Sequence, residues 1–351
     1  MIAAGLAGLG ISFGVAVAAL PLLIRLSERF NLFDDPGEER KIHSKRTSFL
    51  GGTGIMIGYF IGVGVVGAIF SLQPHYIAML WAAIFGTFLT GLADDFFNLR
   101  ASIRFLLQFM LGGLLVYKSD LVLPINDILG FTAAIPHGNL ILTVVILSAI
   151  TNAFNLIDGM DGLAGTLALI ASAAYSVINL LENDIYFAVV AMALTGCLIA
   201  FLLFNRSPAS IFMGDNGSYL VGLVLSVLTV NFIANTDVPD LSLQNRFAIG
   251  LSLIAVPSFD LVRLFLTRIV RGQSPFVADR NHIHHLLLDV GLPVSKVLVS
   301  VAGLSVFIVL SALLTMRHVP FLVFAVSSTA LYTLILLFLK RILRSRGEQE
   351  A

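Results

Sequence analysis

Apolar stretches long enough to cross a lipid bilayer recur along the whole sequence. An α-helix needs about twenty apolar residues to span the hydrocarbon core, and we count about eleven stretches of that kind. The chain is 58% hydrophobic and only 12% charged, so a water-soluble fold would lack the polar surface to cover its core. The sequence therefore predicts an all-α, multi-pass membrane protein in which residues 1–351 form one integral-membrane domain. The predicted spans are Ala3–Leu26, Leu50–Leu72, Tyr76–Ala93, Ile103–Tyr117, Leu140–Leu156, Leu163–Leu181, Ile185–Phe204, Ser218–Ala234, Phe247–Ile269, Val297–Thr315 and Phe321–Leu339.

The distribution of basic residues predicts how these spans are oriented. Of the 21 Lys and Arg residues, all but Lys118, Arg246 and Arg317 fall at one set of span ends. Because cytoplasmic ends are enriched in Lys and Arg, the N-terminus is predicted outside and the C-terminus inside. The first apolar stretch is followed, not preceded, by basic residues (Arg25 and Arg29). It is therefore predicted to be a first span and not a cleavable signal peptide.

Charge and cysteine content exclude two further features. The formal net charge is zero, so bulk charge indicates no nucleic-acid partner. The single cysteine, Cys197, lies within an apolar stretch, which rules out an intrachain disulfide.

The stretch NAFNLIDGMDGLAGT, residues 152–166, places polar side chains between two apolar runs. Asn152, Asn155, Asp158 and Asp161 follow one another at intervals of three residues. If the segment is helical, all four lie near one face. Such groups are costly beside a membrane unless they serve a cation or a polar ligand, and oxygen ligands suit a hard cation with its phosphate. The alternative is a polar loop between two membrane helices.

An adjacent pair of carboxylates, Asp94 and Asp95, ends the third span in GLADDFFNLRASIRFLLQ. Neighbouring residues of a helix point about 100° apart, so the two are expected to have different tasks. One would face the reaction while the other fixes a neighbouring base or cation. A solvated acidic pair at a helix end is the alternative.

A lone carboxylate stands among glycines in FMGDNGSYLVG, where Gly214 and Gly217 flank Asp215. Glycine allows a tight turn and the close approach of a phosphate or metal. The first loop, DDPGEERKIHSKRTSFLGG, holds a basic cluster that lipid headgroups would also explain. Its closing Gly51 and Gly52 allow a close backbone approach.

The last polar loop, RGQSPFVADRNHIHHLLLDVG, gathers Arg280, His282, His284 and His285. The histidines lack the HExxH spacing of zinc hydrolases. Cationic and imidazole groups suit phosphates and sugar hydroxyls, while a zinc site and a basic loop that only sets orientation remain alternatives. All these motifs fall on the predicted cytoplasmic side, where they would suit Mg²⁺ and a pyrophosphate substrate. A cation-coupled transporter would instead place ionisable groups near the bilayer midplane.

The chain resembles the polyprenyl-phosphate N-acetylhexosamine-1-phosphate transferases, in their WecA/TagO-like branch. The resemblance rests on RKIH…GG, DDFFNLRASIRFLLQ, NAFNLIDGMDGLAGT, FMGDNGSYLVG and PSFDLVRLFLTRIVRGQSPFVADRNHIHH, in that order over nearly the whole chain. HIHH after SPFVADR is typical of this branch; the sister branch that makes the peptidoglycan lipid precursor has three consecutive histidines. One departure is KRTSFLGG, where the family usually has prolines and an arginine just before the glycines.

The resemblance implies a reaction in the bacterial cytoplasmic membrane. Undecaprenyl phosphate, a membrane lipid, attacks UDP-GlcNAc in a cytoplasmic cleft, releasing UMP and forming the first lipid-linked intermediate of a cell-envelope polysaccharide such as lipopolysaccharide or teichoic acid. The same chemistry with another UDP-N-acetylhexosamine or with UDP-MurNAc-pentapeptide is the alternative within the family. The oligomeric state stays open, a homodimer included.

The resemblance also implies roles for individual residues. Asp215 and Asn155 would contact Mg²⁺, with Mn²⁺ as an alternative. Asp94, Asp95, Asp158 and Asp161 would be catalytic, Asp94 as a base or a positioning group. Substrate-binding residues would be Lys41, His43, Asn98, Arg104, Asn152, Phe212, Arg280, His282, His284 and His285.

Overall fold

The computed structural model describes residues 2–34, 46–72, 74–117, 119–126, 136–235, 241–274, 281–315 and 318–350. By its internal contacts the chain divides into two compact units, Met1–Leu241 and Ser242–Ala351. The prediction that residues 1–351 act as one integral-membrane domain stays a prediction. The predicted Lys41, His43 and Arg280 lie outside the described residues.

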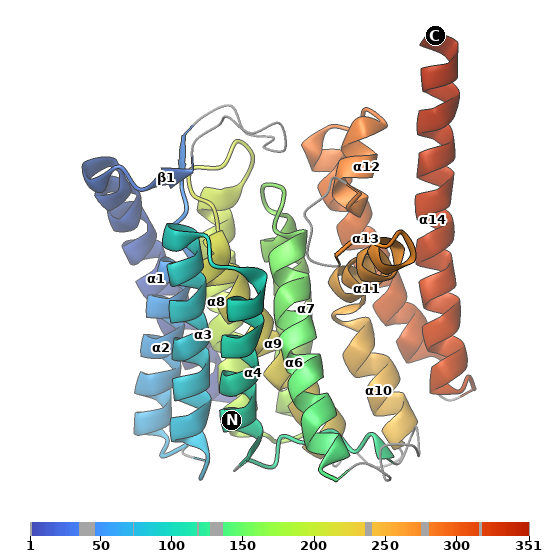
Figure 1. The fold of residues 1–351 in the computed structure, drawn as a ribbon. Helices are drawn as coiled ribbons and strands as arrows, with labels where there is room; N and C mark the ends of the chain where they lie inside the picture. The colour runs from blue at the N-terminus through green and yellow to red at the C-terminus, as the bar shows by residue number, and fades with distance from the viewer. Residues whose placement is uncertain are drawn as a thin grey trace. The chain divides into compact units, whose positions relative to one another are not determined.

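Helices supply nearly all of the regular secondary structure of the first unit (Figure 1). Its elements are α1 (Ile2–Phe30), β1 (Phe33–Asp34), β2 (Thr47–Ser48), α2 (Gly51–Ile69), α3 (Ile77–Phe97), α4 (Ala101–Tyr117), α6 (Gly138–Ile157), α7 (Leu163–Leu181), α8 (Ile185–Asn205) and α9 (Gly214–Asn235). The second unit contains α10 (Leu243–Ser252), α11 (Ala255–Val270), α12 (Ile283–Asp289), α13 (Val294–Thr315) and α14 (Phe321–Glu350).

The helices confirm the prediction of an all-α, multi-pass membrane protein. Among the described residues, 9 helices are long and apolar enough to cross a membrane, and the bent pair α10–α11 could form one more span. The shorter apolar helix α4 coincides with the predicted Ile103–Tyr117. These elements correspond one to one to the predicted stretches, while their orientation across the membrane stays a prediction.

One predicted span is bent. The stretch Phe247–Ile269 forms two helices, α10 and α11, which meet at 83°. Pro257 is the third residue of α11. Proline lacks the N–H that a continuous helix would use there, and it is tolerated in a first turn, where N–H groups have no helical partner. Hydropathy alone does not reveal such a break.

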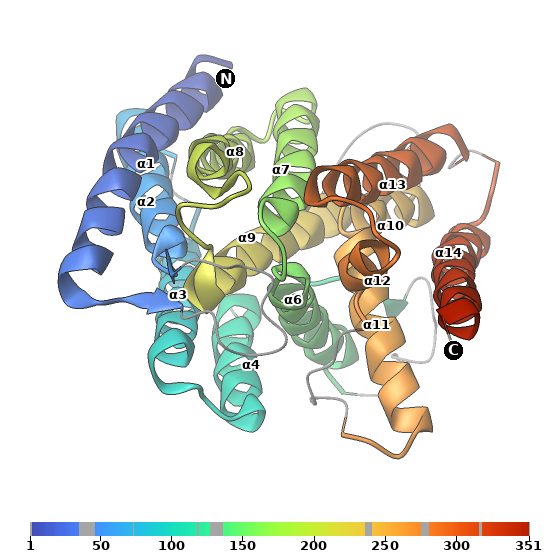
Figure 2. The ribbon, with the colours of Figure 1, turned by 90° about the horizontal axis from the view of Figure 1, so that it is seen from above.

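Helix α9 is the centre of the first unit. Figure 2 shows it surrounded by α2, α3, α6, α7 and α8, all of which contact it. Of the residues in its most apolar part, 94% are buried. Two of its internal hydroxyls bond to their own helix: Ser226 donates to Leu223 O and Thr229 to Leu225 O. Because hydroxyls satisfied this way can lie in an apolar interior, α9 can be buried on all sides and can place its first residues rigidly.

Candidate active site

Polar side chains from three helix ends meet in the first unit. Asp94 and Asp95 lie in the last turn of α3, Asn155 in the last turn of α6, and Asp215 in the first turn of α9. Because α3 and α6 both pack against α9, these ends lie together. We call these four residues, with Asp158, the carboxylate cluster.

Asp94 is buried and fully paired. Its carboxylate accepts hydrogen bonds from Arg104 Nη1 at 2.8 Å, from the Tyr219 hydroxyl at 2.9 Å and from the Leu99 N–H at 2.8 Å. Its side chain is 3% exposed, against 29% for Arg104. Burial of a carboxylate is tolerated because these donors replace water. Arg104, one of the predicted phosphate-binding residues, is therefore held by Asp94 with part of its side chain still open.

Asp95 caps the start of α9. Its two oxygens accept the backbone N–H groups of Asp215 at 2.8 Å and Asn216 at 3.0 Å. It also accepts the Asn216 side-chain amide. The first N–H groups of a helix have no helical partner, and a carboxylate there is favoured by the helix dipole. Asp94 and Asp95 therefore bond to different partners, while their different tasks in the reaction stay a prediction.

Asp215 is bonded to the second residue of the predicted metal pair. Asn155 Nδ2 donates to Asp215 Oδ1 at 2.6 Å and to Ser218 Oγ at 3.1 Å. The charges of both Asp94 and Asp95 also act on Asp215. The preceding Gly214 has φ +72°, and a Cβ there would overlap the Phe49 carbonyl, which confirms the predicted tight turn.

The expectation that four polar residues share one helical face is wrong beyond Ile157. Helix α6 ends at Ile157 with Asp158 as its C-cap, and Gly162 has φ +78°. That glycine is the N-cap residue of α7, which begins at Leu163, so Asp158 and Asp161 lie in the turn between α6 and α7.

Two predicted residues of that stretch make contacts away from Asp215. Asn152 is buried and donates to Gln108 Oε1 on α4 at 2.5 Å and to Ser148 O at 2.8 Å. Asp161 accepts the Ala209 N–H at 3.1 Å. Their predicted roles in substrate binding and catalysis stay predictions.

Asp158 interacts electrostatically with Asp95, another member of the carboxylate cluster, and with Asp161. Burial, then the charges of Asp95 and Asp161, raise its pKa to about 7. At neutral pH its carboxyl is therefore about half protonated. A cation bound nearby would favour the charged form, so Asp158 can respond to metal binding.

The segment before α9 is held by the first loop. β1 and β2 pair antiparallel, with Phe33 opposite Ser48. Phe212 N donates to Ser48 O at 2.7 Å, and Gly52 N donates to Met213 O at 2.8 Å. This contact confirms the close backbone approach expected at the glycine pair, and it fixes the backbone of the half-buried Phe212. Asn98, another predicted residue, is the exposed left-handed C-cap of α3.

The three predicted histidines lie together in the second unit, and we call them the histidine cluster. The ring centroids of His284 and His285 are 4.3 Å apart, and those of His282 and His284 are 5.5 Å apart. His284 is 1% exposed, and among the described residues neither of its ring nitrogens has a hydrogen-bond partner. Burial, then His285 and His282, lower its pKa to about 3, so His284 is neutral at physiological pH.

Two residues missed by the sequence analysis, Tyr219 and Asp260, hydrogen-bond through their side chains to predicted site residues. Tyr219 follows Asp215 by four residues, a spacing that places both on one helical face, and it bonds to Asp94. Asp260 bonds to His282 Nδ1 at 2.8 Å. A single acidic residue inside an apolar stretch is a signal that could have found Asp260.

The cluster fits a magnesium ion that is completed by substrate. In the part of the chain that the structure describes, no three His, Cys, Asp or Glu side chains form a metal-binding group. Mg²⁺ typically takes one or two carboxylates and fills its shell with water and substrate phosphates. Asp215 supplies such a carboxylate, and Asn155, which bonds to it, has a carbonyl oxygen as a second candidate ligand.

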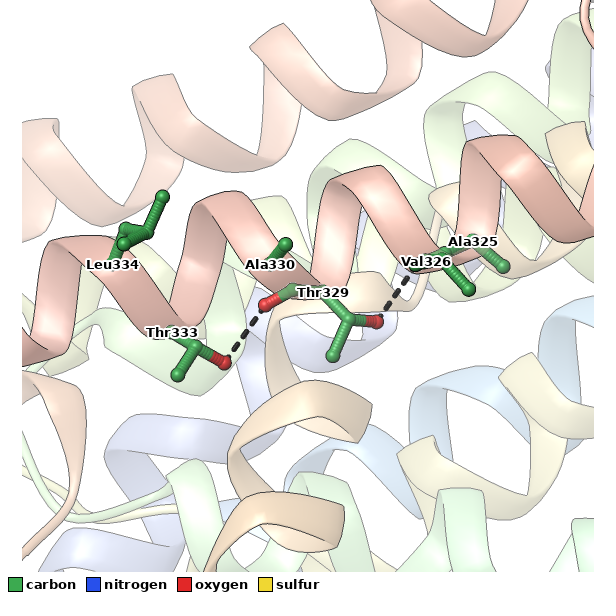
Figure 3. Close-up of a pocket in the computed structure, with 6 residues that line it drawn as sticks. All are labelled: Ala325, Val326, Thr329, Ala330, Thr333 and Leu334. Carbon is green, nitrogen blue, oxygen red and sulfur yellow. Dashed lines mark hydrogen bonds between the residues drawn. The ribbon is translucent and has the colours of Figure 1, made fainter.

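A cavity along α14 is lined by uncharged side chains. Figure 3 shows six residues of α14 lining a cavity of about 610 Å³: Ala325, Val326, Thr329, Ala330, Thr333 and Leu334. The hydroxyls of Thr329 and Thr333 donate to the carbonyls of Ala325 and Thr329, each at 2.8 Å. The lining therefore resembles a lipid-facing surface.

Fold and site together define a multi-pass membrane protein whose acidic and amide groups meet at helix ends. A family model described as glycosyl transferase family 4 matches residues 77–233, the segment from α3 to α9 that contains the whole carboxylate cluster. A relative from Mycobacterium leprae (strain TN) is 31% identical, and the match covers 69% of its length. The chain belongs to glycosyl transferase family 4, which confirms the family predicted from the motifs.

Curated relatives have specific names. The probable undecaprenyl-phosphate N-acetylglucosaminyl 1-phosphate transferase of Bacillus subtilis (strain 168) is 29% identical over 274 residues, 78% of this chain and 74% of the relative. The decaprenyl-phosphate N-acetylglucosaminephosphotransferase of Mycobacterium leprae (strain TN) is 31% identical over 278 residues, 72% and 69%. The undecaprenyl-phosphate alpha-N-acetylglucosaminyl 1-phosphate transferase of Escherichia coli (strain K12) is 27% identical over 274 residues, 76% and 72%.

Proposed function

We propose that this protein transfers N-acetylglucosamine 1-phosphate from UDP-GlcNAc to a polyprenyl phosphate. The observation that supports this most directly is the carboxylate cluster, in which Asp94, Asp95 and Asp215 meet at helix ends within the segment that the family model matches. The names of the relatives support the transferred group and the lipid acceptor. In a bacterium that makes undecaprenyl phosphate, this lipid is the expected acceptor.

The reaction is a phosphoryl transfer. An oxygen of the lipid phosphate attacks the β-phosphorus of the donor, the bond from that phosphorus to the UMP oxygen breaks, and a lipid-linked sugar diphosphate forms. Such a transition state needs little covalent help, so positioning and charge compensation dominate. The lipid phosphate is largely ionised at neutral pH, so it needs little assistance from a base.

The described residues have distinct parts in this proposal. Asp215 and Asn155 would hold Mg²⁺, which would supply positive charge to neutralise diphosphate oxygens and to favour departure of UMP. Asp95 fixes the backbone of Asp215 through the cap of α9. Asp94 holds the guanidinium of Arg104, and the remaining Arg104 donors bind phosphate oxygens.

We also propose that the cluster faces the cytoplasm of a bacterial cytoplasmic membrane. Of the 21 basic residues, all but Lys118, Arg246 and Arg317 lie on the predicted cytoplasmic side. A site at helix ends suits a reaction between a water-soluble nucleotide sugar and a phosphate anchored in the bilayer.

An assay with purified protein tests the function. We expect UMP release that needs UDP-GlcNAc, undecaprenyl phosphate and Mg²⁺ together, that EDTA abolishes, and that Mg²⁺ or Mn²⁺ restores. The lipid product should carry one GlcNAc and two phosphates by mass spectrometry. Turnover only with another UDP-N-acetylhexosamine or with UDP-MurNAc-pentapeptide would reassign the donor. Absence of UMP with all these donors would refute the proposal.

A further inference from the structure

A buried carboxylate of the second unit stands at the centre of a hydrogen-bonded network. Asp260 on α11 is 2% exposed. Its Oδ2 lies 2.8 Å from His282 Nδ1. Its Oδ1 accepts the Tyr332 hydroxyl of α14 at 2.9 Å and Arg263 Nη2 at 2.9 Å.

The network joins three helices of that unit at one point. Asp260 and Arg263 are three residues apart and share a face of α11. His282 is the N-cap residue of α12, and Arg263 Nη2 also donates to the backbone carbonyl of Asn281, directly before it. The network therefore holds both the ring and the backbone of His282. A buried carboxylate is costly unless donors surround it, so its three donors here explain how it is accommodated.

The carboxylate also decides where the proton of His282 lies. An ionised carboxylate only accepts hydrogen bonds, so Nδ1 must be the nitrogen that carries a proton. His282 Nε2 is then the nitrogen left for a ligand. The side chain of His282 is 9% exposed, which leaves a small part of it accessible.

We propose that Asp260 is a positioning residue for the transfer reaction. It keeps His282 protonated at Nδ1 and orients Nε2 for the sugar phosphate of the donor, while Tyr332 and Arg263 hold Asp260 in place. This inference rests on the proposed function and on the predicted role of the histidine cluster. At metal sites, a carboxylate that accepts a hydrogen bond from one nitrogen of a ligating imidazole likewise orients the other nitrogen.

A kinetic cycle tests whether Asp260 acts through His282. We expect Asp260→Asn, which keeps the side-chain shape, and His282→Gln each to lower kcat for UMP release about tenfold or more. The double variant should be within about twofold of the slower single variant, because both changes remove one function. If the two losses instead multiply, Asp260 acts independently of His282 and the proposal is wrong.

A milder pair of variants separates positioning from packing. Tyr332→Phe removes one donor to Asp260 and should lower kcat about two- to tenfold. Tyr175→Phe is the matched control, because it removes a similarly buried hydroxyl bond, 2.8 Å to Thr229, in the first unit. It should lower the unfolding temperature while leaving kcat within about twofold. Equal kcat values for Tyr332→Phe and the native protein would contradict the role of Tyr332 and Asp260.

The position of the proton can be measured without any turnover. With ¹⁵N-labelled histidine, the His282 signal among the seven histidines is assigned by its loss in His282→Gln. We expect Nδ1 to be protonated in the native protein, and this preference to be lost in Asp260→Asn, because an asparagine can donate as well as accept. A native His282 with a bare Nδ1 would overturn the inference. If the native protein releases no UMP, the proposed function fails, whereas the nitrogen spectrum still decides the position of the proton.

Discussion

Asp215 begins α9 with its carboxylate bonded to Asn155 and acted on by two neighbouring carboxylate charges. Asp215→Asn keeps the shape of the side chain but removes the charge that attracts a cation. We expect turnover to fall at least about a hundredfold and the unfolding temperature to change little. Asp184→Asn is the control, because Asp184 caps α8 through Phe187 N and should leave turnover within about twofold. Near-normal turnover of Asp215→Asn at ordinary Mg²⁺ would remove it from the metal site.

A second residue, Asp158, makes the free energy of unfolding depend on pH. Its pKa in the folded protein, about 7, lies above the usual value for Asp, so the folded state binds the proton more tightly than the unfolded chain. Its stabilising contribution is therefore complete below the unfolded pKa, about 4, and is lost as pH rises to about 7. We expect Asp158→Asn, in EDTA, to be more stable than the native protein at pH 8 by about 1–3 kcal/mol, and by less at pH 5. Thermal unfolding at both pH values measures this, and parallel pH profiles for the two proteins would contradict it.

At the scale of elements, the start of α9 depends on a backbone contact with α2. A Cβ at Gly52 would overlap the backbone of Gly217, and neither backbone can move without shifting Asp215. We expect Gly52→Ala to destabilise the protein by about 1–3 kcal/mol and to abolish UMP release. Gly14→Ala in α1 is the control, because a Cβ there meets nothing within 4 Å, and alanine should be neutral or slightly stabilising. Equal unfolding temperatures for the two variants would show that the contact is not tight.

At the scale of the whole molecule, the basic residues predict which side of the membrane each helix end faces. Ser207 and Asn235 are exposed residues on either side of α9, which is long enough to cross the membrane. In a Cys197→Ala background, we expect an impermeant thiol reagent added outside cells to label Asn235→Cys but not Ser207→Cys. Ser207→Cys should react only after the membrane is permeabilised. The opposite pattern would reverse the orientation and place the carboxylate cluster outside.

Local properties of the chain made much of this predictable. The spans were found because crossing a bilayer requires a continuous apolar stretch of fixed length, and the tight turn at Gly214 because glycine readily adopts a positive φ. Local rules also explain two departures from the expected helices in hindsight. Helix α6 ends at Ile157, and the left-handed Gly162 directly precedes α7. Pro257 lies in the first turn of α11, next to the break between α10 and α11.

The sequence by itself determined the membrane class, the number of apolar stretches and the motifs that identify the family, because each depends on residues close together in the chain. Only the tertiary structure decided how the polar residues pair. Asp94 meets Tyr219 across 125 positions, and Asp260 meets Tyr332 across 72. Asp95, adjacent to Asp94, caps a helix 120 residues further on. Such pairs depend on which helix ends pack together, and hydrophobic burial decides that over the whole chain without marking a partner in the sequence.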